Sequence, residues 1–278
     1  MPPINARQLF AEMVRCAESD IDLAKANLFI AKEEYPDLDV EKYLRKLDTI
    51  ADNVRKRVAG ARDPRVIIRR MNEYLFEEEG FTGNTEDYYD PRNSFLNDVL
   101  DRKTGIPITL STVYLEVGHR IEFPVTGVGF PGHFLVKCSY EKEEILIDPF
   151  NKGLILSEAD CKARLDQIYG GAMEFQEQFL AAVTKKQILT RMLQNLKSIY
   201  IHHQDYPRAL SVVERILLIH PNMPQEVRDR GFLYYHLERY IQALADFERY
   251  LKIAPDAPDG SSIRENIQVL RKFIAITN

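Results

Sequence analysis

The sequence predicts an α+β fold that ends in helical repeats, and three observations lead to this prediction. Apolar residues recur at helical spacing up to about residue 121. Short β-branched or aromatic segments, separated by turn residues, then occupy residues 125–156. From about residue 187 the chain repeats itself. We therefore expect a helical lead-in, a small antiparallel sheet and a C-terminal array of helical hairpins.

The helical lead-in shows both apolar periodicity and cap residues. Asp63 and Pro64 suit the cap and first position of one helix, and Pro107 lies in the first turn of another, "PITLSTVYLEVGHRI". Beyond the strands, Ser157 and Asp160 signal the start of a further helix. The helical segments expected from periodicity are residues 6–17, 21–31, 40–58, 107–121 and 157–169.

Four strand-like segments follow one another, "VTGVGF", "HFLVKC", "EILID" and "GLILS". A hairpin turn centred between Tyr140 and Glu141 would place Phe134 opposite Ile147 and Lys137 opposite Glu144. The same register places His133 opposite Asp148, at the cross-strand spacing that lets an aspartate orient an imidazole. The pair is open to two interpretations, a catalytic base with its orienting group or a polar pair satisfied at a sheet edge.

The C-terminal region repeats with a period of 34 residues. Identities at this offset are Tyr200/Tyr234, Tyr206/Tyr240, Ala209/Ala243, Leu210/Leu244, Glu214/Glu248, Leu217/Leu251 and Pro221/Pro255. Paired helices, a small residue in the second helix and a terminal proline are the tetratricopeptide signature. We expect two repeats and a closing helix at residues 261–275, and a division into residues 1–183 and 184–278.

Composition and short motifs argue against several classes of partner and cofactor. A net charge of −5 and a pI near 5.8 argue against nucleic acid and anionic membranes as partners. The N-terminal residues lack signal-peptide features and no apolar run reaches membrane-spanning length, which favours a cytoplasmic location. The three cysteines match no metal or redox spacing, and neither a phosphate-binding loop nor a dinucleotide fingerprint is present. We predict neither a metal nor a cofactor.

The run "GIPITLSTVYLEVGHRIEFPVTGVGFPGHFLVK…EEILIDPFNKG" resembles the transglutaminase-like core, a papain-related fold. With "ILTRMLQNLKSIYI" and the repeats, residues 60–275 resemble the bacterial SirB-type family, which has no settled function, and a related core occurs in an animal F-box protein. The resemblance implies that His133 matches the general base and Asp148 its orienting group. The helix-borne cysteine of the enzymes falls on Pro107, and no cysteine lies between Cys16 and Cys138.

Two further groups of residues are candidates for the site. Ser111 lies one helical turn beyond Pro107 and could replace the nucleophile, or it could bond a carbonyl one turn back. Asn93 and Asn97, at helical spacing, and Arg102 could line the same groove, or they could serve as a cap and as surface residues.

The leading hypothesis is an inactive transglutaminase-like module that binds a peptide or protein, with the repeats as a second interaction surface. One alternative is an amide or ester hydrolase in which His133 and Asp148 act with Ser111 or with an activated water. A third hypothesis makes the core a rigid platform for the repeats. The sequence indicates no oligomeric state and names no partner.

Overall fold

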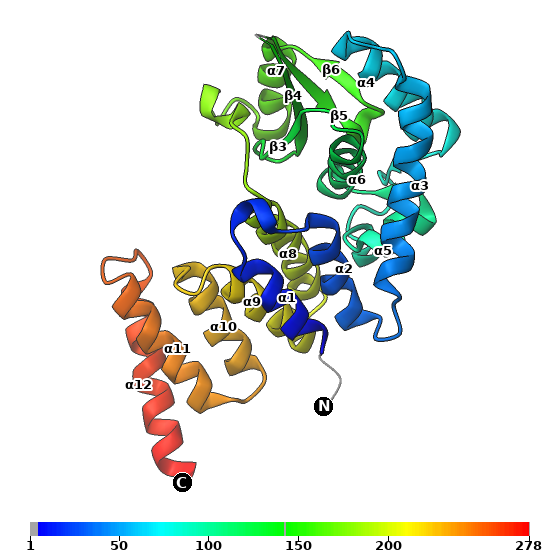
Figure 1. Cartoon of the computed structure of the whole chain (residues 1–278). Coiled ribbons are helices and arrows are strands. Elements are labelled where there is room, and N and C mark those ends of the chain that lie inside the picture. The colour runs from blue at the N-terminus through cyan, green and yellow to red at the C-terminus, as the bar shows by residue number, and fades with distance from the viewer. Residues whose placement is uncertain (1–4, 142, 278) are drawn as a thin grey trace. The chain divides into compact units, whose positions relative to one another are not determined.

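The computed structural model describes residues 5–141 and 143–277, and the chain divides into two compact units, residues 1–192 and 193–278 (Figure 1). The boundary between the units falls inside α8 (Lys185–His202). The first unit combines helices with small sheets, and the second is helical. The predicted α+β class with C-terminal repeat helices is confirmed.

In the described part of the first unit, six α-helices precede the main sheet. Asp63 caps α4 through the Arg65 amide at 2.8 Å, with Pro64 as the first helical residue, as predicted. Pro107 likewise opens α6. The helices are α1 (Ala6–Arg15), α2 (Leu23–Glu34), α3 (Val40–Val58), α4 (Pro64–Asn72), α5 (Leu96–Arg102) and α6 (Pro107–Arg120). A π-helical turn (Glu73–Glu78) follows α4.

The main sheet has four antiparallel strands in the order β3-β4-β5-β6 and is followed by α7 (Glu158–Tyr169). Its strands are β3 (Val125–Val128), β4 (Leu135–Tyr140), β5 (Glu143–Asp148) and β6 (Leu154–Leu156). A short parallel ladder of β1 (Thr82–Gly83) and β2 (Thr104–Gly105) was not predicted, because two-residue strands carry no periodic signal. The ladder matters for the site because β2 leads directly into α6.

The predicted register of the β4–β5 hairpin was wrong by two residues. Ile147 lies opposite Val136 rather than Phe134, because the turn lies one residue further along the chain, where Glu141 has a φ of +53°. Since the shift is even, each side chain keeps its predicted face of the sheet. Lys137 still pairs with Glu144, at 2.9 Å, but along a diagonal.

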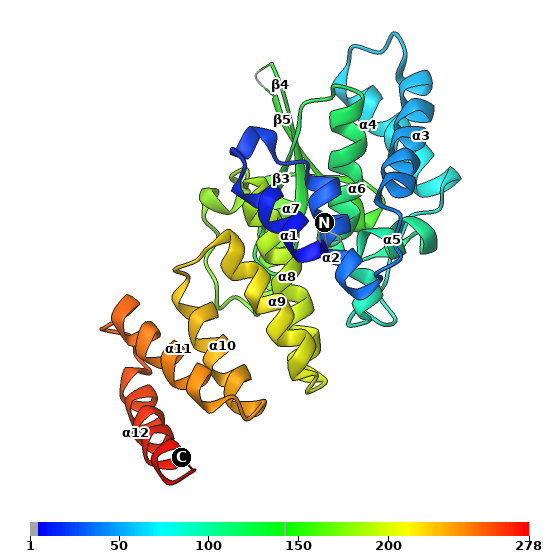
Figure 2. The ribbon, with the colours of Figure 1, turned by 60° about the horizontal axis from the view of Figure 1, so that its bottom comes forward.

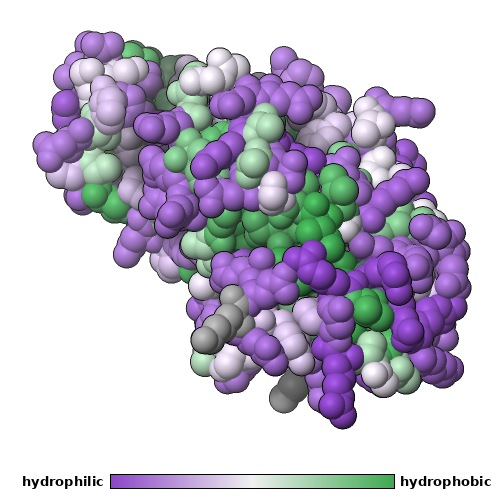
Figure 3. Space-filling view, turned by 90° about the horizontal axis from the view of Figure 1, so that it is seen from above, coloured by the Kyte–Doolittle hydropathy of each residue, from purple (hydrophilic) through white to green (hydrophobic). Residues whose placement is uncertain are grey.

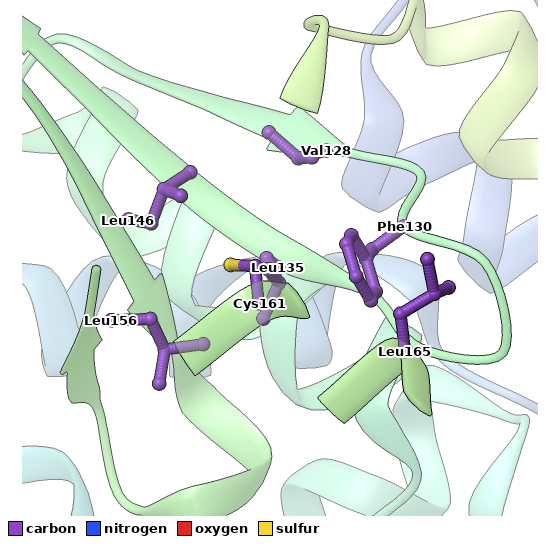
Figure 4. Packing of buried hydrophobic residues seen from close by; sticks show 7 residues of the cluster. All are labelled: Val128, Phe130, Leu135, Leu146, Leu156, Cys161 and Leu165. Carbon is purple, nitrogen blue, oxygen red and sulfur yellow. The ribbon is translucent and has the colours of Figure 1, made fainter. Parts of the chain in front are cut away.

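Each face of the sheet packs against a different helix. Figure 4 shows the side chains of one face directed toward Cys161 and Leu165 of α7. On the other face α6 packs against β3 and β4 (Figure 1 and Figure 2), and a Cβ at Gly118 would lie 2.5 Å from Val125. The strand residues on the α7 face are Val128, Leu135, Leu146 and Leu156. By the two-residue alternation of a strand, Asp148 belongs to this α7 face as well.

The second unit continues from α8 as a helical array in which successive helices pack side by side. Tyr206 and Tyr240, which the 34-residue offset relates, each pack on the following helix. The Tyr206 ring stacks on the His236 ring with 4.4 Å between centroids. The Tyr240 ring contacts the Phe273 ring edge-on with 4.8 Å between centroids. This is the nearest-neighbour packing of a repeat protein. The helices after α8 are α9 (Tyr206–Ile219), α10 (Pro224–His236), α11 (Tyr240–Ile253) and α12 (Gly260–Thr277).

On the face drawn in Figure 3, hydrophobic residues gather between wide hydrophilic areas. Within the described residues, none of the helices combines the length and apolar character that crossing a membrane would require.

Candidate functional site

A tight turn places His133 at the start of β4. Its backbone N–H donates to the Phe130 carbonyl at 3.0 Å, which closes a four-residue turn. Pro131 and Gly132 occupy the central positions, and Gly132 has a φ of +68°, the combination typical of a type II turn. A Cβ at Gly132 would also lie 2.9 Å from Ile168 of α7. The sequence "FPGH" therefore fixes the position of the imidazole through local backbone geometry.

The structure brings His133 and Asp148 together. His133 Nε2 lies 3.0 Å from Asp148 Oδ1, although the two residues are not directly opposite each other in the hairpin. Asp148 is completely buried, and its Oδ2 accepts from Asn151 Nδ2 at 2.8 Å. The contact has the base-and-orienter geometry, and the catalytic role itself stays a prediction.

Arg164 of α7 enters the same contact. Its Nη1 lies 2.8 Å from His133 Nε2 and also forms an ion pair with Asp148 Oδ2. Guanidinium nitrogens only donate hydrogen bonds, whereas a carboxylate only accepts them. The two contacts therefore require opposite protonation of Nε2: a bond to Asp148 needs the proton there, and a bond from Arg164 needs the lone pair.

The surroundings of Asp148 favour its charged form. Burial by itself would raise the pKa of this carboxyl group, but hydrogen bonds from His133 and Asn151 and the positive charge of Arg164 lower the pKa below its ordinary value. Asp148 is thus a buried carboxylate that forms an ion pair with Arg164. This arrangement joins β5 to α7 through charge as well as through the apolar cluster.

The Phe150 ring lies between His133 and the short ladder that precedes α6. The Phe150 ring packs edge-on to the His133 ring, with 6.0 Å between their centroids. A Cβ at Gly83 would lie 2.5 Å from the same Phe150 ring, and Gly83 pairs with Gly105, two residues before Pro107. The structure therefore links His133 to the Pro107 end of α6, where the resemblance locates the nucleophile of the enzymes.

Within residues 5–141 and 143–277, neither a serine nor a cysteine forms a hydrogen bond with the His133 ring. Ser111 is fully buried, and its hydroxyl donates to the Phe134 carbonyl at 3.4 Å rather than to the imidazole. Cys161 faces the apolar cluster, where burial raises the pKa of its thiol to about 11. Such a thiol carries almost no thiolate at neutral pH.

The predicted groove residues divide into two groups. Asn93 lies in a 3₁₀ turn (Pro91–Asn93) and Asn97 in α5, so the two do not share a helix face as predicted. Asn93 is tied to the first turn of α6, because Thr109 Oγ1 donates to its carbonyl at 2.8 Å. Arg102 joins Asn93, with its Nη1 3.4 Å from Asn93 Oδ1, whereas Asn97 lines a separate pocket.

A second arginine, Arg191 of α8, contacts the backbone of the His133 turn. Arg191 Nη2 donates to the carbonyls of His133 at 2.7 Å and Phe130 at 3.0 Å. Burial lowers the pKa of Arg191, and the neighbouring Tyr88 and Tyr169 hydroxyls partly counteract this. Within residues 5–141 and 143–277, Arg191 forms no ion pair with a carboxylate.

Sequence reasoning missed both arginines of the site. Arg164 lies on α7 beside the two buried residues of that helix, Cys161 and Leu165, and a charged residue next to such buried positions is a signal that could have revealed it. Arg191 gave no comparable signal, since it lies in a helix that the 34-residue period assigned to the repeats.

Comparisons with known proteins agree with this architecture. Residues 41–194, more than half of the chain, match the Transglutaminase-like superfamily, and residues 196–268 match the Tetratricopeptide repeat. A UPF0162 protein of Xylella fastidiosa is 35% identical over 226 residues, covering 80% of each chain. One of Vibrio cholerae is 31% identical over 225 residues, covering 80% of this chain and 83% of that protein.

The transglutaminase-like part also resembles a eukaryotic protein. The human F-box only protein 21 is 31% identical over 170 residues, which cover 57% of this chain and 26% of that protein. No solved structure matches the chain. Taken with the His133 site and the repeat helices, these findings show that the chain belongs to the UPF0162 family of bacterial proteins, the SirB-type architecture of a transglutaminase-like domain followed by tetratricopeptide repeats.

Proposed function

We propose that this protein is a non-catalytic transglutaminase-like scaffold that binds a peptide or protein at the His133 site. The observation that carries the proposal is the 2.8 Å contact between Arg164 Nη1 and His133 Nε2. A neutral imidazole that accepts at Nε2 holds its proton on Nδ1, so Nδ1 has no lone pair with which to act as a base. Arg164 thus competes with Asp148 for the nitrogen that sets the tautomer.

The absence of a suitable nucleophile supports the same proposal. Pro107 has no nucleophilic atom, the Ser111 hydroxyl is bonded to a backbone carbonyl, and the Cys161 thiol is buried with a raised pKa. Nucleophilic catalysis requires the nucleophile within hydrogen-bond reach of its base. Among the described residues none meets this condition at His133.

Arg191 suggests which chemical group the site receives. It is a largely buried guanidinium with carbonyl partners and, in the described part of the chain, no carboxylate partner. A guanidinium in a low-dielectric site gains most from a carboxylate or another anion. We propose that an acidic side chain or a C-terminal carboxylate of the partner binds there.

Binding and turnover of one peptide library would test the proposal. We expect the wild-type protein to retain peptides that carry a carboxylate, and Arg191→Met to lose at least tenfold in affinity for them. Arg45→Met is the matched control, because Arg45 is exposed and lies on α3. Mass spectrometry of the retained peptides should show unchanged masses.

Two results would overturn the proposal. One is equal peptide affinity in wild type and Arg191→Met. The other is a time-dependent product that His133→Ala abolishes, which would support the hydrolase alternative. That alternative is favoured by one observation: within the described residues Nδ1 of His133 makes no hydrogen bond, so a water could bind there if Nε2 donates to Asp148.

The repeats would supply a second binding surface, since helical repeat arrays commonly bind proteins along their exposed faces. Several large apolar side chains of the second unit are exposed, among them Tyr235, Ile241 and Val269. A cytoplasmic location and a protein or peptide partner stay predictions.

A further inference from the structure

A pocket of about 480 Å³ lies between α11 and α12 of the second unit, and we refer to it as the α11–α12 groove. Its lining has an apolar part, Leu251 and Ile267, and a charged part, Glu248, Lys252, Arg264 and Arg271. Three cations and one carboxylate give the groove a positive charge, although the whole chain has a net charge of −5. The groove therefore attracts anionic groups.

The 34-residue period shows what fills the same place in the preceding repeat. Arg264 corresponds to Arg230 at this offset. Arg230 binds Asp246 of α11 through two hydrogen bonds of 2.6 Å, from its Nε and its Nη2. The Phe247 ring of α11 packs next to this pair, 2.6 Å from the place of a Cβ on Gly231. The groove thus repeats a surface that binds a helix through a carboxylate and an apolar side chain.

Two cations of the groove have no carboxylate partner. Arg271 is neutralised locally, since its Nη2 donates to Glu248 Oε1 at 2.7 Å. Lys252 and Arg264 form no ion pair within residues 5–141 and 143–277. Hydrogen bonds between such cations and a carboxylate are about twice as strong as neutral ones. The groove therefore offers two binding positions for acidic side chains.

A polar end cap is the other interpretation of the groove, because the last repeat of an array needs a soluble outer face. Lys252 and Arg271 occupy the positions of Leu218 and Leu237 in the preceding repeat. Solubility alone would be served better by acidic than by basic residues. Both replacements are basic, so their sign favours an acidic partner over a cap.

We propose that the α11–α12 groove binds an amphipathic, acidic helix of a partner protein. One carboxylate of this helix pairs with Arg264 and another with Lys252, while an apolar side chain between them packs on Leu251 and Ile267. The inference gives the second binding surface of the proposed function a place and a chemistry. It rests on that part of the proposed function and not on peptide binding at His133.

Fluorescence anisotropy of the full chain with three labelled helical peptides tests the proposal. The first peptide carries leucines along one face, flanked by glutamates, and in the other two every glutamate is replaced by glutamine or by lysine. We expect the glutamate peptide to bind at least tenfold more tightly than the other two, with an affinity that falls as the salt concentration rises.

Variants of the groove locate the binding. Lys252→Gln/Arg264→Gln should weaken binding of the glutamate peptide at least tenfold. Lys272→Gln is the matched control, because Lys272 is exposed on the same helix and does not line the groove. A reversed charge guards against variants that fold poorly: Lys252→Glu/Arg264→Glu should bind the lysine peptide more tightly than the glutamate peptide.

Three results would overturn the proposal. If the glutamate peptide does not bind, or binds no more tightly than the glutamine peptide, the groove is a polar end cap only. An unaltered order of affinities in Lys252→Glu/Arg264→Glu would exclude the groove as the binding site. Loss of glutamate-peptide binding in Arg191→Met would assign the acidic ligand to the His133 site instead. Failure of peptide binding at His133, by contrast, would leave the affinities measured at the groove unchanged.

Discussion

Replacing Arg164 by methionine removes the charge that neutralises Asp148 while keeping the length of the side chain. Asp148 would remain fully buried with hydrogen bonds from His133 at 3.0 Å, from Asn151 Nδ2 at 2.8 Å and from the Asn151 amide at 3.3 Å. We therefore expect the first unit to lose stability while its apolar cluster stays intact.

The magnitude follows from the type of interaction lost. Breaking a buried ion pair by removing one partner costs about 3–5 kcal/mol, and one hydrogen bond to a charged group contributes about 1.5–3 kcal/mol. The Arg164 side chain is 22% exposed and Asp148 keeps three other hydrogen bonds, so the cost should fall below that of a fully buried pair. It should be close to the value for one hydrogen bond to a charged group. We expect a loss of about 2–3 kcal/mol in the free energy of unfolding of the first unit.

Hydrogen exchange followed by mass spectrometry is the suitable assay, since peptides from β4 and β5 report on the first unit alone. Lys162→Met, on the same helix, removes an exposed ion pair with Glu158 and should cost less than about 0.5 kcal/mol. The variant Arg164→Met/Asp148→Asn should be less destabilised than the two single changes added together. Additivity within about 0.5 kcal/mol would refute the coupling between the two residues.

The pH dependence gives a second check on the same pair. The folded-state pKa of Asp148 is lowered, so its contribution is present above the unfolded pKa of about 3.9 and is lost as the pH falls through the folded value. Removing Arg164 raises that folded pKa. The stability difference between wild type and Arg164→Met should therefore shrink as the pH falls below about 4, and a difference that stays constant in melts from pH 6 to pH 3 contradicts the assignment.

Three further predictions concern backbone, thiols and repeats. Gly132→Ala should cost about 1–3 kcal/mol in the first unit and weaken peptide binding, as seen in melts and titrations, because φ is +68° there. Of the three thiols only the exposed Cys16 should react rapidly with Ellman's reagent, while buried thiols such as Cys161, with a pKa raised to about 11, react after unfolding; three fast thiols would contradict this. Gly231→Ala should destabilise the second unit by about 1–3 kcal/mol, measured by exchange in α10, because the new Cβ would lie 2.6 Å from Phe247.

Helices and strands were predictable from sequence because their signals are local. The cap and proline at Asp63 and Pro64, the box at Ser157 and Asp160, and the alternation of the four strands all give elements close to those observed. The hairpin register was not predictable in the same way. The sequence around its turn contains no glycine or asparagine, the residues that usually mark a hairpin turn. The left-handed conformation of Glu141 therefore could not be predicted from the residue types.

The site was predicted in part. "PGH" and "ILID" led to His133 and Asp148, since a turn and a strand end give both residues fixed places. The Arg164 contact depends on α7 packing across the sheet, a long-range event that strand and helix periods do not encode. Asn97 was assigned to the wrong neighbourhood, because the chain breaks its helix between Asn93 and Leu96.

The position of α8 also determines where a fragment that contains the first unit can end. A fragment that stops at residue 183, where the sequence predicts the end of the first domain, would lack the segment that carries Ile188, Leu189 and Met192, all of them buried. It would also lose the guanidinium of Arg191 that clamps the carbonyls on either side of the Pro-Gly turn. An excised core should therefore extend at least to residue 192, and a shorter one would be expected to aggregate through its uncovered apolar surface.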